Sequence, residues 1–419
     1  MSIHRIFFTL LSLLFLTLPS SYGQPVVKTG LEVLLDRNFD ILQGKRVGLV
    51  TNPSGVDHLL VSTLDIFFNA PQVNLVAVYA PEHGARGDVY AGGKVSDTVD
   101  KETGLPVWSL YGSTRKPTPE MLEGIDVMVY DIQDVGVRSY TFISTLGLVM
   151  EACAAKDIEV VVLDRPNPLG GNKVEGCLVE SAFNSFVSQY RIPYIYGLTV
   201  GELANLINSE GLNRGQKGTS EPSRCKLSVV PMEGWTRDMT YADTGLPWVM
   251  PSPNIPTAET SIYYAASGIC GELYGFLNIG VGYTIPFRTF AAEWIDAKAL
   301  KDRLDSYELP GISWRTIYYK PYSGSSSGKL VQGVECFFTD YSAARITEVQ
   351  FYVMQAIAQL YPSRRAFETV SSVGLFDKVC GTDYIRKTFS RSYLVDDILD
   401  YWRKDEEAFR TLSEKYYIY

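Results

Sequence analysis

Short apolar segments alternate with segments of helical periodicity through the first half of the chain. Nearly continuous runs of Val, Leu and Ile are typical of strands buried on both faces, and they occupy residues 46–51, 73–80, 126–131 and 159–164. Segments with helical spacing lie between and after them, at residues 59–69, 117 to about 124, 141–156 and 199–208. This alternation predicts an α/β fold with a parallel sheet and helices on both of its faces.

The pattern changes after residue 210. Residues 211–223 are polar and rich in Gly and Ser, which indicates a loop or linker near a domain boundary. Another strand-like run covers residues 225–231, and helices are expected near residues 291–304 and 344–360. The second half is therefore predicted to be a further α/β region.

Polar residues collect where the predicted parallel strands end. Asn52 follows the first strand, Glu82 the second, Asp131 ends the third, and Asp164 ends the fourth. In open parallel sheets, ligands bind just outside the carboxyl ends of the strands. The sequence therefore predicts an acid-rich site at this edge of the sheet.

Glu82 is the leading candidate for catalysis. It stands between Pro81 and His83 in a PEHG segment that predicts a tight turn at a strand end. There the carboxylate could act as a general acid, base or nucleophile, or it could simply stabilise the turn. His83 is a weaker candidate, for substrate contact. The chain has only three histidines, so a histidine zinc cage is not expected.

A second candidate cluster lies in the segment DIQDVGVRSY, which starts at Asp131. Asp131 and Asp134 beside Arg138 could titrate far apart, as acid–base chemistry requires. Arg138 could equally hold a substrate carboxylate, with Gln133 and Tyr140 as further substrate contacts. The alternative is a buried ion pair that fixes the loop.

A third candidate cluster lies in the segment DRPNPLGGNKVEG. For Asp164 and Arg165, a structural turn and a functional role are weighed equally. Asn167 and Glu175 are the better candidates to face a sugar or an amide.

The first 23 residues predict a signal peptide. A short positive start, an apolar run over residues 6–18 and small residues at positions 21 and 23 predict cleavage before Gln24. The alternative is an uncleaved anchor, but the run is shorter than the ~20 residues that a spanning helix needs. The protein is therefore expected to be exported, periplasmic or secreted, with no membrane association after cleavage.

Charge and motifs narrow the function classes. The formal charge of −9 argues against nucleic acid or an anionic membrane as a partner, but a local arginine could still bind an anionic small substrate. No G-x-G-x-x-G segment opens a predicted helix, so no dinucleotide cofactor is expected.

Several segments together resemble the exo-β-N-acetylmuramidase family, a glycoside hydrolase family. The similar segments are GLEVLL (30–35), GKRVGLVTNPSGVD (44–57), APEHGARGD (80–88), GLPVWSLYG (104–112), DIQDVGVRSYTFIST (131–145), DRPNPLGG (164–171) and PSPNIPT (251–257). The resemblance implies a glycosidase that removes N-acetylmuramic acid from the non-reducing ends of peptidoglycan fragments, without a metal or organic cofactor. It also implies a Rossmann-like catalytic domain, over residues 24–223, and a smaller α/β auxiliary domain, over residues 224–419.

The resemblance also suggests site residues. The acidic positions of the family correspond most securely to Glu82, with Glu32, Asp131 and Asp134 as further candidates, and acid and nucleophile stay unassigned among them. The lactyl carboxylate of the sugar could pair with Arg86, Arg138 or Arg165. Its acetamido group could be held by Asn52, Gln133 or Asn167.

One segment departs from the family pattern. Many relatives carry charged residues in the glycine-rich stretch that corresponds to residues 271–287, whereas this chain has Ile279, Val281 and Ile285 there. The difference motivates an alternative function, a non-catalytic protein that binds cell-wall amino sugars. An amidase or esterase is the third reading, but no suitable Ser/His or zinc arrangement supports it.

Overall fold

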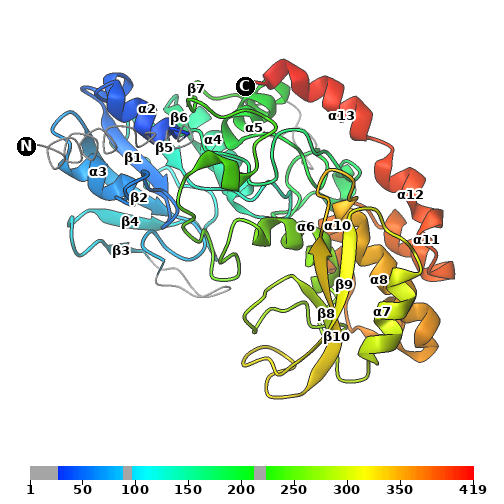
Figure 1. Ribbon diagram of the computed structural model, residues 1–419. Helices are drawn as coiled ribbons and strands as arrows, with labels where there is room; N and C mark the ends of the chain where they lie inside the picture. The colour runs from blue at the N-terminus through cyan, green and yellow to red at the C-terminus, as the bar shows by residue number, and fades with distance from the viewer. Residues whose placement is uncertain (1–26, 88–96, 212–222) are drawn as a thin grey trace, which may run out of the picture.

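The larger part of the protein is built on a parallel sheet. In the computed structural model, which describes residues 27–87, 97–211 and 223–419, seven strands form the order β3-β4-β2-β1-β5-β6-β7 (Figure 1). All neighbours pair in parallel except β3 and β4. The strands are β1 (Arg46–Thr51), β2 (Asn74–Ala80), β3 (Thr98–Val99), β4 (Pro106–Ser109), β5 (Val127–Asp131), β6 (Glu159–Leu163) and β7 (Leu227–Val230).

Helices cover both faces of this sheet, as the alternating pattern predicts. One face packs against α2 (Gly30–Asp36) and α3 (Thr63–Asn69), through Leu34 and Phe67. The other packs against α4 (Phe142–Ala154) and α5 (Val200–Glu210), through Leu146 and Leu203 among others. The strands are almost wholly apolar because each is buried from both sides.

The second unit contains a smaller, antiparallel sheet of order β8-β10-β9. Its strands are β8 (Thr289–Ala292), β9 (Ile312–Tyr319) and β10 (Val331–Phe338). The remaining α-helices are α6 (Thr260–Gly271), α7 (Ala297–Asp305), α8 (Val349–Leu360), α9 (Ala366–Thr369), α10 (Gly374–Cys380), α11 (Tyr384–Ser392), α12 (Asp396–Arg403) and α13 (Glu406–Ser413). Short 3-10 turns lie at Asp40–Leu42, Ser181–Phe183, Tyr241–Thr244, Ile346–Glu348, Pro362–Arg364 and Glu414–Tyr416. The α/β class and the two-unit arrangement agree with the sequence.

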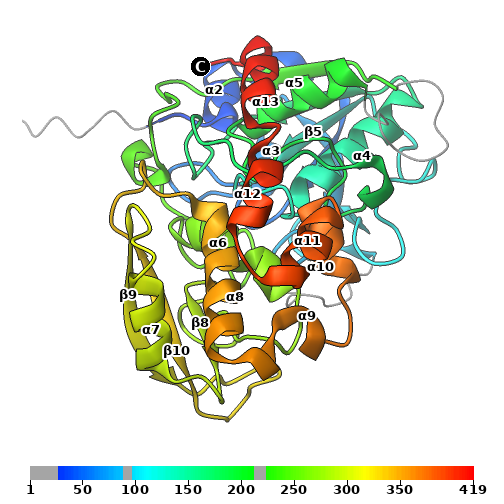
Figure 2. The same ribbon diagram turned by 90° about the vertical axis from the view of Figure 1, so that its right-hand side faces the viewer.

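The boundary expected at residue 223 differs from the structure. Strand β7 follows that position, yet it pairs with β6 in the first sheet. The C-terminus also returns to the first unit, where α13 lies beside α5 (Figures 1 and 2) and the Tyr419 hydroxyl donates to Asp164 at 2.8 Å. The described residues on both sides of the polar segment, in α5 and in β7, therefore belong to the first unit.

One helix prediction is wrong, and a second places the start of a helix too early. Residues 117–124 form turns, because two prolines in a segment this short leave too few residues to complete a helix. Residues 291 and 292 belong to β8, and α7 begins later, where the Asp296 side chain caps the helix by accepting from the Ala299 amide at 2.9 Å.

Arg138 fastens the two units together. Its guanidinium, 1% exposed, donates to the carbonyls of Cys177 and Ile192 at 2.8 and 2.6 Å, and to those of Val379 and Cys380, both at 2.9 Å. The last two carbonyls lie at the C-terminal end of helix α10, where a positive charge interacts favourably with the helix dipole. The structure thus uses Arg138 as an internal connector, not as the substrate contact that the sequence suggested.

We expect Arg138→Met to lower the free energy of unfolding by about 3 kcal/mol or more, because the buried carbonyls lose their donors. Denaturant unfolding measures the change. Arg138→Lys should lose less, since an ammonium still supplies donors. A variant that keeps its stability would contradict the connecting role.

Candidate active site

A cavity of about 410 Å³ lies between the carboxyl edge of the larger sheet and the second unit. The first unit contributes residues from the turn after β2 and from the start of α4, and the second contributes α6 and the loops near residues 280 and 325. The polar side chains among the described lining residues are Glu82, His83, Ser139, Tyr140, Thr141, Ser252, Asn254, Tyr264, Glu272, Tyr274, Asn278 and Ser325.

Glu82 stands at the end of β2, where the sequence predicts it. The Gly84 amide donates to the Pro81 carbonyl at 3.2 Å and closes the turn, and His83 is held at a φ of +78°. A positive φ at a residue other than Gly is strained and is typical of functional sites. Burial and the adjacent Glu82 carboxylate, which shares a hydrogen bond with the Tyr111 hydroxyl, raise the pKa of Tyr111 to about 12. The Glu82 carboxylate thus shares a hydrogen bond with the Tyr111 hydroxyl and also lines the cavity.

Glu272, the residue after α6, brings a second carboxyl group into the cavity from the other unit. Burial raises its pKa to about 7. Within the described part of the chain, no cation forms an ion pair with it. A carboxyl group in such surroundings is protonated in a large fraction of molecules at neutral pH, so it can donate a proton.

Aromatic hydroxyls join the two units at the cavity wall. Ser139 bonds to the hydroxyl of Tyr264 at 2.9 Å and to that of Tyr194 at 3.0 Å. The rings of Tyr140 and Tyr264 meet edge to face, with centroids 5.8 Å apart. Tyr140, a predicted substrate contact, therefore lies in the cavity, on a wall that this network holds rigid.

Asp131 does not reach the cavity. Its carboxylate is fully buried in an ion pair with Arg165, whose Nε and Nη2 approach the two oxygens at 2.5 and 2.8 Å, and the Thr63 hydroxyl also donates to it. Arg165 bonds in addition to the Val56 carbonyl at 2.9 Å. Asp131 is therefore in a buried ion pair, but its partner is Arg165 and not Arg138, the arginine that the sequence suggested, and neither group is available to a substrate.

Asp134 lies behind the cavity wall. It accepts from the Gly136 amide at 2.8 Å and from the Tyr196 hydroxyl, and burial raises its pKa to about 6. Gln133 is buried beside it and donates to the carbonyls of Asp134 and Pro166 at 2.8 and 2.7 Å. Both side chains support the loop that carries the cavity residues, but neither lines the cavity.

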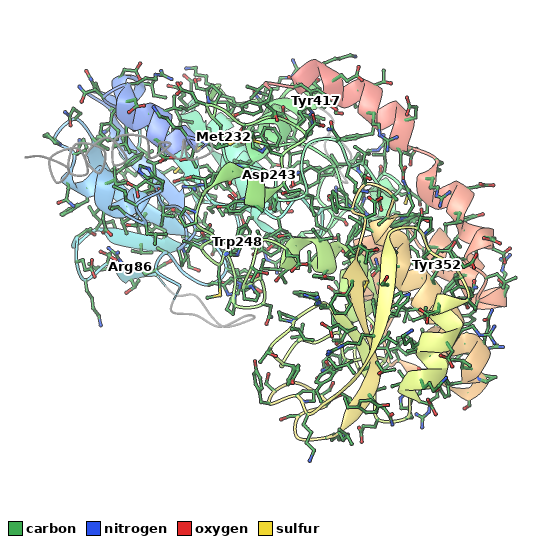
Figure 3. All side chains as sticks on the ribbon, in the orientation of Figure 1. Arg86, Met232, Asp243, Trp248, Tyr352 and Tyr417 are labelled. Carbon is green, nitrogen blue, oxygen red and sulfur yellow. The ribbon has the colours of Figure 1, made fainter. Side chains whose placement is uncertain are left out.

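Arg86 is held at the surface beside the outer strands (Figure 3). Its guanidinium pairs with Asp65 at 2.9 Å and with Asp100 at 2.6 Å, and it does not line the cavity. The hydrogen bond from Arg86 is the main cause that lowers the pKa of both carboxyl groups. This cluster anchors the segment that follows the Glu82 turn.

Glu32 is part of a helix cap. Its carboxylate accepts from the Thr29 amide at 2.8 Å at the start of α2 and contacts the His58 ring. Burial acts to raise the pKa of Glu32, but the hydrogen bonds from Thr29 and His58 outweigh it and lower the pKa. The Glu32 carboxylate is kept ionised by hydrogen bonds inside the protein, so its role is structural.

The other two predicted amide contacts, Asn52 and Asn167, are also internal. Asn52 donates to the Pro251 carbonyl at 3.1 Å and so connects the end of β1 to the loop that contributes Ser252 to the cavity. Asn167 donates to the Leu198 carbonyl at 2.9 Å. Neither amide lines the cavity.

Glu175 joins the two units away from the cavity. It accepts from the amides of Ile346 and Thr347 at 3.2 and 2.9 Å and from the Thr347 hydroxyl at 2.9 Å. It therefore binds the amino end of a 3-10 turn, which suits a negative charge.

Of the site residues that the sequence predicts, the structure brings Glu82, His83 and Tyr140 together. Glu272 was missed, although an acid without a neighbouring cation inside an apolar, glycine-rich stretch was a usable signal. Among the residues that the structure describes, no group of three or more His, Cys, Asp or Glu side chains is arranged to hold a metal ion.

Two carboxyl groups thus face one cavity over the carboxyl edge of a parallel sheet, where ligands bind in folds of this class. Comparison with known proteins identifies the family. Models of the N-terminal and C-terminal domains of the exo-β-N-acetylmuramidase NamZ match residues 47–259 and 262–419. The chain belongs to this family of glycoside hydrolases.

Relatives agree over nearly the whole chain. The peptidoglycan β-N-acetylmuramidase NamZ of Bacillus subtilis is 41% identical over 94% of this chain and 92% of its own length. A crystal structure of a DUF1343 family protein from Bacteroides fragilis matches with 51% identity and a TM-score of 0.89, over 95% of this chain and all of that one. A second DUF1343 structure from that organism matches with 28% identity and a TM-score of 0.72, over 94% of this chain and 99% of its own.

We expect Asp131→Asn to destabilise the protein by about 3–5 kcal/mol, because it leaves the buried Arg165 guanidinium uncompensated. Thermal unfolding measures the change. Unchanged stability together with complete loss of activity would instead assign Asp131 a direct part in the chemistry.

Proposed function

We propose that the protein is an exo-acting glycosidase that releases N-acetylmuramic acid from the non-reducing ends of peptidoglycan fragments. The observation that carries the proposal is the pair Glu82 and Glu272, which face one cavity from opposite units and differ in environment. Membership of the muramidase family and the named activity of the Bacillus subtilis relative support the choice of sugar.

The two carboxyl groups suit the two tasks of glycoside hydrolysis. Glu272, with a pKa of about 7, can protonate the leaving oxygen. Glu82 can activate water or stabilise the positive charge that develops on the sugar ring. The hydroxyls of Ser139, Tyr140 and Tyr264 lie beside them and can bind the sugar hydroxyls and pack against its ring.

The size of the cavity suits removal of a terminal residue. Its volume of about 410 Å³ is in the range of sites for single small molecules, not of an extended groove. The loop at Gly324 and Ser325 and the segment after α6 bound it on the side of the second unit. A chain end can enter such a site, whereas the middle of a glycan strand cannot.

Export follows as part of the same proposal, because peptidoglycan lies outside the cytoplasmic membrane. The predicted signal peptide falls outside the described residues. In the part of the chain that the structure describes, no helix has the length and apolar character needed to cross a membrane.

We expect Glu82→Gln to reduce release of muramic acid from a nitrophenyl glycoside by at least about 10³-fold, while the melting temperature stays within a few degrees. Glu123→Gln, the same change at an exposed position, is the matched control. Activity within a few-fold of wild type would remove Glu82 from the mechanism. Sugar binding without any product from the wild-type protein would favour the sugar-binding alternative.

Glu272→Gln separates the two roles. A general acid must be protonated, so wild-type activity should fall as pH rises through about 7, and the variant should lose this limb of the profile. The loss of kcat should be about 10²–10⁴-fold on a natural disaccharide but much smaller on a nitrophenyl glycoside, whose leaving group needs little proton donation. Equal losses on both substrates would contradict the assignment.

A further inference from the structure

Tyr274 is the one exposed aromatic side chain among the described residues that line the cavity between the two units. It is 75% exposed, whereas Tyr140 and Tyr264 are partly buried in the wall. A residue that lines the cavity and is still this exposed lies at the rim. Single exposed aromatic residues are common on protein surfaces and by themselves indicate no site. The case for Tyr274 depends on how its backbone is held and on its position relative to Glu272.

The turn that carries Tyr274 is anchored on both sides. The Phe276 amide donates to the Leu273 carbonyl at 3.0 Å, which closes a turn with Tyr274 and Gly275 at its corner. Leu273 and Phe276 are 1% and 3% exposed, and both belong to the apolar core around α6 and α8. Gly275 has a φ of +83°, which favours glycine at the third position of such a turn. The two buried neighbours therefore fix the backbone of Tyr274 at the surface without any ligand.

The same segment sets the relation between Tyr274 and the proposed general acid. Glu272 follows α6, its amide donates to the Ile269 carbonyl at 3.2 Å, and its side chain lines the same cavity as Tyr274. A general acid must lie within hydrogen-bonding distance of the oxygen that it protonates. In glycoside hydrolysis, that oxygen departs with the leaving sugar. The leaving sugar must therefore lie on the side of the cavity that the second unit forms, where Tyr274 stands.

The size of the cavity places the leaving sugar at the rim. The volume of about 410 Å³ suits the terminal sugar, so the next sugar of the chain lies outside the enclosed space. The ring of Tyr274 is available at this level. An aromatic ring packs against the C–H groups of a sugar face, and the tyrosine hydroxyl can bond to sugar hydroxyls at its edge.

We infer that Tyr274 is the platform of a subsite for the leaving sugar, which in peptidoglycan is N-acetylglucosamine. The subsite rests on the proposed function and adds a contact outside the space for the terminal sugar. The ring packs against the leaving sugar while Glu272 gives its proton to the oxygen of the breaking bond, and water supplies the hydroxyl of the released sugar. The contact orients that oxygen toward the acid and uses binding energy from a part of the substrate that does not react.

Calorimetry in the Glu82→Gln background, in which turnover is expected to be lost, tests the contact. The ligands are N-acetylmuramic acid and its β-1,4-linked disaccharide with N-acetylglucosamine, neither of which carries a peptide. We expect Tyr274→Ala to weaken binding of the disaccharide about ten-fold, equivalent to about 1.4 kcal/mol, and to change binding of the monosaccharide by less than about two-fold. Tyr274→Phe, which keeps the ring, should retain the affinity for the disaccharide.

Tyr318→Ala is the matched control, because Tyr318 is 59% exposed on β9 and does not line the cavity. Unchanged binding of the disaccharide by Tyr274→Ala would overturn the inference. An equal loss for both ligands would also overturn it, because Tyr274 would then act on the terminal sugar or on the fold. A wild-type protein that releases no N-acetylmuramic acid from the disaccharide would overturn the proposed function itself.

Discussion

The position of the two units relative to each other depends on one buried guanidinium. Arg138 donates to carbonyls of the first unit and to the carbonyls that end α10 in the second. Burial lowers the pKa of Arg138, yet the group stays charged because four acceptors replace its water shell. Ser139 and Tyr140 follow it directly and line the cavity, so the connector and the site share one segment. A change at Arg138 is therefore expected to disturb the cavity wall at Ser139 and Tyr140, while Glu175 still connects the two units.

The second unit covers most of the carboxyl edge of the sheet, which decides what the polar residues there do. Once covered, a polar group must find partners inside the protein, and Asp131, Asn52 and Asn167 all do so. Glu82 also has an internal partner, since it shares a hydrogen bond with Tyr111, but its turn follows the end of β2 and lines the cavity. The cavity lies at the carboxyl edge of the sheet, as the general rule for parallel sheets predicts. Most of the polar residues that suggested this edge bond to other parts of the protein and do not line the cavity.

The sequence predicts the parallel sheet well because strands buried on both faces are apolar throughout and helices between them keep their own period. The antiparallel sheet of the second unit was missed, although its strand β9 alternates between buried and exposed positions as a half-buried strand should. That β7 completes the first sheet depends on pairing between distant segments. Glu82 was predictable from its turn after a strand. Glu272 could be suspected from its apolar, glycine-rich surroundings, but the burial that raises its pKa is decided only by the fold. The strand-end arginine Arg165 was ambiguous for the same reason, since its partner is fixed only by the fold.

The proposed chemistry takes place between Glu82 and Glu272, not at Asp131 or Asp134. The direct test is a crystal structure of Glu82→Gln with a disaccharide that ends in N-acetylmuramic acid. The account predicts the terminal ring in the cavity beside Tyr140, with the glycosidic oxygen within hydrogen-bonding distance of the Glu272 carboxyl. A sugar bound instead against Arg165 and Asp131, with the cavity empty, would contradict it.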